Sequence, residues 1–306
     1  MPKLWAVSDL HVGHRGNRPV TESIRPEDPQ DWLIVAGDVS EKVHDVRWAL
    51  ELLRKRFAKV IWTPGNHELY TTSTDPVQMF GQPRYEYYVS QCREIDVLTP
   101  EDVYPLWEGE GGPVRIVPLF LLYDYTFLPK GTTDKAQALA YARSKNVVAT
   151  DEYLLSAEPY PTRDSWCRAL VEKAAKRLDA LDPGEQKILV NHWPLVREPT
   201  RVLHPREFSL WCGTTATADW HLKYNAAAVV YGHLHIPRTT WYDGVRFEEV
   251  SVGYPREWQR RGLPHPLLRQ IWPDPELSEE TVGLGGARFP VTPEMVAAVK
   301  THLEGQ

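Results

Sequence analysis

The sequence predicts an α/β protein, and two observations support this expectation. Short apolar runs of strand-like composition alternate along the chain with longer stretches in which apolar residues recur at helical spacing. Five of the short runs end in a block of polar residues; they are residues 4–7, 33–36, 60–62, 188–190 and 228–231. Catalytic groups in open sheets gather where strands pass into loops. The sequence therefore predicts a functional site at one end of these strands.

The helical stretches have recognisable ends. Between residues 46 and 57 the apolar positions follow a helical period, and basic residues occupy 54–56, where cations suit the negative end of the helix dipole. A second helix is expected to begin near Thr162 and to stop at Pro183-Gly184, ahead of the strand at 188. The pattern of strand, helix and strand is thus predicted to repeat.

Further strands are expected at 114–122 and after the last polar block. There, Asp243-Gly244 separates 239–242 from 245–247, which is the strongest short hairpin signal in the chain. The stretch from 262 to 293 is rich in Pro and Gly and is predicted to be irregular, with a final helix at 293–302. Because no repeat or linker stands out, residues 1–306 are predicted to form a single domain with an irregular C-terminal extension from about 262.

Composition limits the classes of partner. The formal net charge of −6 gives no electrostatic footprint for nucleic acid. Three widely spaced cysteines argue against a disulfide framework or a thiolate metal cluster. The first strand leaves no room for a signal segment, and no apolar run approaches the ~20 residues of a membrane span. We therefore expect a cytoplasmic protein with no nucleic-acid or membrane partner; its oligomeric state is left open.

The five polar blocks contain carboxylate, amide and imidazole side chains, which are common metal ligands. Because the side chains of residues i and i+2 at a strand end point the same way, Asp9 and His11 are predicted to bind one ion together. His233 and His235 repeat this geometry. In chain order the blocks are Asp9-Leu10-His11, Gly37-Asp38, Gly65-Asn66-His67-Glu68, Asn191-His192 and Gly232-His233-Leu234-His235.

Asp38 is the predicted bridge between two ions. A carboxylate can reach two cations with its two oxygens, and the preceding glycine allows a tight turn. Asn66 and His192 would complete the second ion. A set of oxygen and nitrogen ligands without thiolate suits Mn, Fe or Zn better than Ca or a closed structural Zn site. The prediction is two divalent or trivalent metal ions, with Mn and Fe favoured and Zn as a further option.

Taken together, the blocks D-x-H, G-D, G-N-H-[DE], H and G-H-x-H resemble the signature of the calcineurin-like metallophosphoesterases. The resemblance implies a four-layer α-β-β-α sandwich of two mixed sheets, with the metals at one end. It also implies that Asp9, His11, Asp38 and His235 hold one metal, and that Asp38, Asn66, His192 and His233 hold the other. His67 lies outside both sets, at the position where the family has a histidine that faces the leaving group.

Several residues keep two interpretations. His67 is either catalytic or a hydrogen-bonding neighbour of the ligands, and Glu41 either orients His67 or is an exposed residue at a helix start. His14 and Arg15 either meet a substrate phosphate or lie in a solvated loop. Four polar residues without a motif are interpreted as structural: Asp124, Asp151, His204 and His221.

The resemblance implies hydrolysis of a phosphoester by a metal-bound hydroxide, with Asp38 and His67 assigned to catalysis. Substrate choice is expected to come from segments near the last block. Residues 208–215 and 218–221 are predicted to line the site, where Trp211 either contacts an organic group or packs in the core. Residues 237–247 and 253–261 bring several arginines close by, Arg238 among them, and make this end locally basic.

The same segments look like those of the bacterial 4′-phosphopantetheinyl hydrolases, a branch that removes phosphopantetheine from carrier proteins. The likeness runs through residues 9–14, 63–69, 208–213 and 254–258 and is weaker beyond Arg261. It implies a phosphodiesterase that releases 4′-phosphopantetheine from an acidic holo-carrier protein. The alternatives are a phosphodiesterase or phosphatase of nucleotides or other small phosphoesters, and a non-enzymatic scaffold on the same fold.

Overall fold

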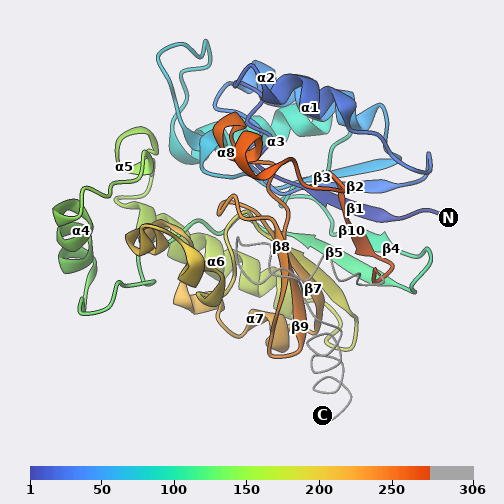
Figure 1. Cartoon of the computed structure of the whole chain (residues 1–306). Helices are drawn as coiled ribbons and strands as arrows, with labels where there is room; N and C mark the ends of the chain where they lie inside the picture. The colour runs from blue at the N-terminus through green and yellow to red at the C-terminus, as the bar shows by residue number, and fades with distance from the viewer. Residues whose placement is uncertain (276–306) are drawn as a thin grey trace.

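Two β-sheets lie face to face with helices on their outer sides, in a computed structural model that describes residues 1–275 (Figure 1). Figure 1 shows α1, α2 and α3 over the first sheet, and α7 on the far side of the second. This arrangement confirms the predicted α/β class and the four-layer sandwich of two mixed sheets. The helix predicted at 293–302 lies outside the described residues. Within those residues, no helix is both long and apolar enough to cross a bilayer.

The first sheet has four strands in the order β10-β1-β2-β3. The first three strands of the chain run parallel, and β10 is antiparallel to β1. The bounds are β1 Leu4–Val7, β2 Trp32–Val35, β3 Lys59–Trp62 and β10 Arg269–Trp272.

The second sheet has six strands in the order β4-β5-β6-β7-β9-β8. Its four inner strands are parallel, and the two edge strands, β4 and β8, are antiparallel to their neighbours. The bounds are β4 Leu106–Trp107, β5 Val114–Pro118, β6 Lys187–Val190, β7 Ala226–Tyr231, β8 Arg238–Tyr242 and β9 Val245–Glu249.

Eight α-helices and four short 3-10 helices connect the strands of residues 1–275. The α-helices are α1 Asn17–Ser23, α2 Val43–Arg54, α3 Gly81–Glu94, α4 Lys135–Ser144, α5 Asp151–Leu154, α6 Arg163–Asp179, α7 Trp220–Lys223 and α8 Pro255–Arg261. The 3-10 helices are η1 His67–Leu69, η2 Glu198–Val202, η3 Arg206–Trp211 and η4 Thr215–Thr217.

The alternation of side chains along each strand creates the layers. Leu4 and Ala6 of β1 face the second sheet, whereas Trp5 and Val7 face the helices. All four are buried, so β1 is apolar on both sides, as expected for a parallel strand that is covered on both faces. The polar block Asp9-Leu10-His11 begins only after this strand has ended.

Most of the predicted elements are confirmed. The five strands and both crossover helices are present, and Thr162 caps α6 through a reciprocal pair of hydrogen bonds with Ser165. The hairpin of β8 and β9 turns at Asp243 and Gly244, whose φ angles of 52° and 79° fit a two-residue turn.

Two predictions about extent were wrong. The strand expected at 114–122 ends at Pro118, because the chain then leaves the sheet. The stretch from 262 is not irregular throughout, since β10 pairs with β1 and places Ile271 in the apolar layer between the sheets. This strand has only four residues and is flanked by prolines, which hid it in the sequence.

Replacing Ile271 by Ala tests whether β10 belongs to the core. Because Ile271 is fully buried, Ile271→Ala is expected to lower the free energy of unfolding by about 2–5 kcal/mol, as large-to-small core changes do. The measurement is denaturant unfolding, and Leu263→Ala is the control because Leu263 is 40% exposed. Equal stability of the two variants would contradict the assignment of β10 to the core.

Candidate metal centre

The predicted ligands lie where strands of both sheets end, in an unusual backbone conformation. Five of them have positive φ angles: Asp9 53°, His11 41°, Asp38 54°, His233 70° and His235 54°. Side chains other than glycine seldom adopt this region, and they keep it only where their surroundings impose it. The loops at this end are therefore held in place by the fold, and their strain marks a functional site.

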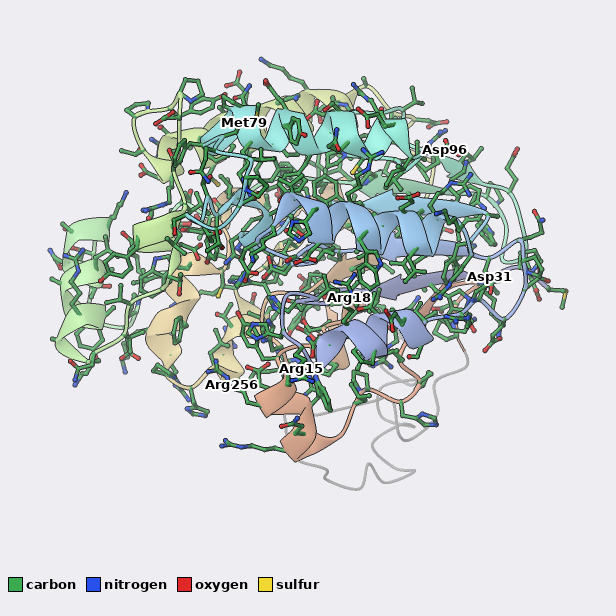
Figure 2. All side chains as sticks on the ribbon, turned by 90° about the horizontal axis from the view of Figure 1, so that it is seen from above. Arg15, Arg18, Asp31, Met79, Asp96 and Arg256 are labelled. Carbon is green, nitrogen blue, oxygen red and sulfur yellow. The ribbon has the colours of Figure 1, made fainter. Side chains whose placement is uncertain are left out.

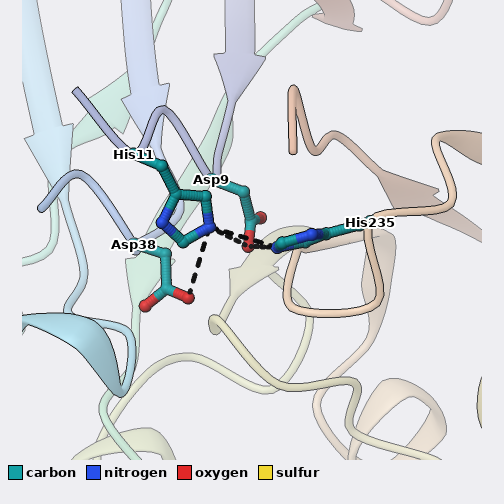
Figure 3. A group of neighbouring side chains, drawn as sticks. All are labelled: Asp9, His11, Asp38 and His235. Atoms are coloured by element: carbon teal, nitrogen blue, oxygen red, sulfur yellow. Dashed lines mark hydrogen bonds and ion pairs between the residues drawn. The ribbon is translucent and has the colours of Figure 1, made fainter. Parts of the chain in front are cut away.

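The first set of side chains is Asp9, His11, Asp38 and His235 (Figure 3). The Nε2 atoms of His11 and His235 face each other at 3.2 Å, and His235 Nε2 is 3.0 Å from Asp9 Oδ1. His11 Nε2 lies 3.9 Å from Asp38 Oδ2. Two imidazole nitrogens and two carboxylate oxygens that converge on one point are a donor set suited to a transition-metal cation.

The second set joins Asp38 to His192 and His233. His192 Nε2 is 3.3 Å from both His233 Nδ1 and Asp38 Oδ2. The Oδ1 atom of Asn66 is buried and has no hydrogen-bond partner within residues 1–275, as expected of an oxygen reserved for a cation. Asp38 Oδ2 thus faces both sets. The structure gathers the side chains in the predicted groups; their binding of two ions stays a prediction.

Hydrogen bonds behind the ligands fix their orientation. Asp9 Oδ2 accepts hydrogen bonds from Ser8 Oγ and Ser251 Oγ at 2.5 and 2.7 Å, which leaves Oδ1 toward the site. The ring nitrogens of the histidines are directed in the same way: His192 Nδ1 is 2.8 Å from the Ala36 carbonyl, and His235 Nδ1 is 2.7 Å from Glu257. Each contact leaves Nε2 to face a metal.

Glu68 joins two of the metal-binding loops. Its buried carboxylate accepts hydrogen bonds from the backbone N–H groups of Asp38, Val39 and Gly65, at 3.1, 2.6 and 2.8 Å. Burial and the nearby Asp38 raise the pKa of Glu68 to about 7. This residue was part of a predicted block, but its role as a link between the β2 and β3 loops could not be read from the sequence.

The glycines that precede Asp38 and Asn66 are required by crowding. A Cβ atom on Gly37 would lie 2.6 Å from both Gly65 N and His192 Nδ1, and one on Gly65 would lie 2.1 Å from Asp38 Oδ1. Gly37 also has a φ of 89°. A side chain at position 65 would displace the shared carboxylate of Asp38, and one at position 37 would push against the Gly65 backbone and the His192 ring.

Opposite charges shift the pKa values of the ligands in opposite directions. Burial raises the pKa of Asp9, but His235 outweighs this effect and holds the pKa below its usual range. Burial lowers the pKa of His235 and His192, but Asp9 and Asp38 raise them to about 10 and about 9. Burial lowers the pKa of His11 and His233. His192 and His235 therefore favour the protonated form, and binding of a cation must release their protons.

His67 lies beside both sets and is held by Glu41. Its Nδ1 atom is 2.6 Å from Glu41 Oε1, and its Nε2 atom is 3.8 Å from Asp38 Oδ2. Burial lowers the pKa of His67, but Asp38 and Glu41 raise it to about 9. Of the two interpretations of Glu41, the structure supports the one in which it orients His67.

Asp151 reaches the centre from a distant segment. Asn66 Nδ2 donates hydrogen bonds to Tyr70 Oη at 2.8 Å and to Asp151 Oδ1 at 3.0 Å, and Tyr70 donates to the same carboxylate. Asp151 begins α5 and was interpreted as structural, because no motif surrounds it. The contact instead fixes which end of the Asn66 amide faces the site, and no local pattern could have revealed it.

The four predicted substrate residues divide into two pairs. His14 and Arg15 are exposed beside the centre, with the His14 ring 5.0 Å from that of Tyr254. Trp211 and Arg238 are buried, so the prediction that they contact substrate is wrong for this structure. Trp211 Nε1 donates to Glu152, and Arg238 donates to the Pro199 carbonyl, which gives both a packing role.

The chain belongs to the calcineurin-like phosphoesterase family, whose model matches residues 2–237. This confirms the membership that the polar blocks predicted. Over 294 residues the chain is 61% identical to the [acyl-carrier-protein] phosphodiesterase PptH of Mycobacterium tuberculosis, covering 96% of this chain and 90% of that protein. The crystal structure of the phosphopantetheinyl hydrolase PptH from the same organism superposes with a TM-score of 0.89 at 63% identity, over 90% of this chain and 98% of the other. Tyr254, Glu257 and β10 lie beyond the family match.

Removal of the Asp151 carboxylate tests its control of Asn66. We expect Asp151→Ala to weaken binding of the second metal ion by about 10- to 100-fold, as loss of a group that orients a ligand does. Asp151→Asn keeps an oxygen acceptor and is expected to retain most of the affinity. Calorimetric titration with Mn²⁺ and elemental analysis after dialysis measure the effect.

The matched control is Asp124→Ala, since Asp124 bonds Thr126 and Thr214 and contacts no ligand. Equal Mn²⁺ affinity in Asp151→Ala and Asp124→Ala would contradict the proposed control of the amide.

Proposed function

We propose that this protein is a two-metal phosphodiesterase that releases 4′-phosphopantetheine from the serine of a holo acyl-carrier protein. The observation that carries the proposal is the convergence of five ligand candidates on the shared carboxylate of Asp38, in a chain 61% identical to an acyl-carrier-protein phosphodiesterase; the five are Asp9, His11, His192, His233 and His235. Mn and Fe suit this donor set best, and Zn is the next choice.

The side chains present fit two cations. Two bound ions would activate a water molecule and neutralise charge on the phosphoryl group. Asp9, His11 and His235 would hold one ion, and Asn66, His192 and His233 the other, with Asp38 between them. His67, oriented by Glu41, would hydrogen-bond to the leaving-group oxygen, and His14 and Arg15 are close enough to the centre to meet the phosphate or the carrier.

An exposed basic surface beside the centre supports an acidic partner. We call Arg15, Arg256 and Arg260 the basic rim; all three are exposed, and Arg15 and Arg256 are labelled in Figure 2. The two segments that carry the rim touch, since Trp258 Nε1 donates to Asn17 Oδ1 at 2.8 Å. Arg256 lies over the ring of Tyr254, 5.1 Å from its centroid, so the rim adjoins the centre.

Not all of the arginines predicted for this end reach the surface. Arg238 and Arg246 are buried, and Arg246 is 2.6 Å from Glu248. The positive charge of this surface therefore comes from Arg15, in the loop after β1, and from Arg256 and Arg260 of α8. A carrier protein with acidic residues around its modified serine would match this charge.

Two alternative functions remain: a different phosphoesterase that uses the same metal centre, and a scaffold protein without catalytic activity. A phosphodiesterase or phosphatase of nucleotides or other small phosphoesters needs only the shared core. A non-enzymatic scaffold is disfavoured, because all seven predicted ligand residues are present in the chain and six of their side chains lie together.

The decisive experiment compares substrates. We expect the Mn²⁺-loaded protein to release phosphopantetheine from holo-carrier protein faster than it hydrolyses cyclic nucleotides or phosphomonoesters at equal concentration. Asp38→Asn is expected to lower this rate by at least about 1,000-fold, because it removes the charge that both ion positions share. Release of phosphopantetheine at the background rate, with activity toward nucleotides, would favour the first alternative. Elemental analysis of both proteins gives the metal content.

Charge reversal of the rim tests the carrier contact. Arg256→Glu is expected to raise KM for holo-carrier protein by about three- to tenfold while kcat and the hydrolysis of a small phosphodiester stay unchanged, since a rim charge acts mainly on encounter. Lys55→Glu is the control, because Lys55 is 70% exposed at the other end of α2, away from the strand ends that carry the ligands. Equal KM values for both variants would exclude the basic rim as the carrier contact.

A further inference from the structure

The segment after β9 crosses from the second sheet to the first and carries a tyrosine onto the candidate metal centre. Ser8 N donates to the Val250 carbonyl at 3.0 Å, and Val252 N donates to the Ser8 carbonyl at 2.9 Å. Gly253 N then donates to the Asp9 carbonyl at 3.0 Å. These bonds pin the chain beside the first ligand block, so the next residue, Tyr254, has a fixed place at the centre.

Contacts on two sides hold the Tyr254 ring. It stacks on His11 with ring centroids 4.3 Å apart and an interplanar angle of 23°, and it meets His235 edge-on at 4.8 Å. Its backbone N–H donates to Glu257 at 2.9 Å, and the same carboxylate oxygen lies 2.7 Å from His235 Nδ1. The ring is therefore fixed relative to the ligands without any help from its hydroxyl.

The hydroxyl of Tyr254 has one partner within the described residues, and that partner is His67. Tyr254 Oη lies 3.1 Å from His67 Nε2, while the other ring nitrogen of His67 is taken by Glu41. A phenylalanine at position 254 would stack on His11 in the same way. The hydroxyl thus adds nothing to packing, but it places a second polar hydrogen beside the histidine expected to face the leaving group.

We propose that the Tyr254 hydroxyl donates a hydrogen bond to the leaving-group oxygen, beside His67. The proposal rests on phosphoester hydrolysis at this centre, as proposed above, but not on the carrier protein as substrate. In the reaction a P–O bond forms to the oxygen of water, and the P–O bond to the leaving group breaks with its electron pair on the leaving oxygen. Water loses one proton and the leaving oxygen gains one, so a diester and water give an alcohol and a phosphomonoester.

The chemistry of the leaving group explains why a second donor is useful. The alkoxide of a serine or another alcohol is strongly basic, so its departure depends on donors that stabilise the growing negative charge. A nitrophenolate is a much weaker base and leaves without such help. Loss of a donor to the leaving oxygen must therefore be costly for alkyl esters and nearly harmless for nitrophenyl esters.

The experiment compares Tyr254→Phe with the wild-type full chain on two phosphodiesters that differ in leaving group, bis(p-nitrophenyl) phosphate and an alkyl diester of phosphopantetheine. We expect kcat for the alkyl diester to fall by about 10- to 100-fold and kcat for the nitrophenyl diester to change by less than about threefold. Metal content and thermal unfolding are expected to match the wild type. Tyr242→Phe, on β8, is the matched control and should change neither rate.

His67→Asn is measured alone and together with Tyr254→Phe. Because both donors act on one oxygen, the double variant is expected to lose less than the product of the two single losses. Equal losses on the two diesters, no loss on either, or loss of a metal ion from Tyr254→Phe would each overturn the proposal. If the wild type cleaves the alkyl diester but not holo-carrier protein, the carrier assignment fails and the test of Tyr254 still stands. If the wild type cleaves no phosphoester, both proposals fail.

Discussion

The rest of the centre depends on the interactions of the Asp38 carboxylate. Its Oδ2 atom faces both groups of imidazoles, while Oδ1 accepts the backbone N–H of His67 at 2.9 Å. The backbone N–H of Asp38 is bound in turn by Glu68. Gly65 has to be a glycine because this carboxylate occupies the space that a side chain would need. The Asp38 carboxylate thus constrains the loops after both β2 and β3.

The two sheets contribute different halves of the centre. Asp9, Asp38 and Asn66 follow strands of the first sheet, while His192 and His233 follow strands of the second. An apolar cluster fills much of the space between the sheets, and the predicted ligands gather where the strands end. The distance between the two halves is set by the packing of apolar side chains such as Ile34 and Ile188. Precise placement of the ligands therefore depends on residues that no metal would touch.

Whether a feature of the site could be predicted depended on how far apart in the sequence the interacting residues are. The ligands could be predicted because each follows an apolar run, and the carboxyl ends of parallel strands meet at one edge of a sheet. Their division into two sets came from the family resemblance. Asp151 could not, because it reaches the centre only through contacts with residues far away in the chain. Residues 253–261 were expected near the site, but the contacts of Tyr254 and Glu257 with His67 and His235 could not be predicted for the same reason. Arg238 and Trp211 were misplaced for the opposite reason: nearness in sequence to the last block suggested exposure, whereas the sheet and η3 turn them inward.

The ligand order along the chain also has a consequence for biosynthesis. Asp9 and His235 are 226 residues apart, and the carboxylate that orients His235 comes later still, at Glu257. On the ribosome, Asp9 is therefore made long before His235, the last side chain of the same set. A nascent chain can pair β1, β2 and β3 while it still lacks half of its donor atoms. The set that contains His235 can therefore be complete only after residue 235 has been made, two residues later than the set that contains His233.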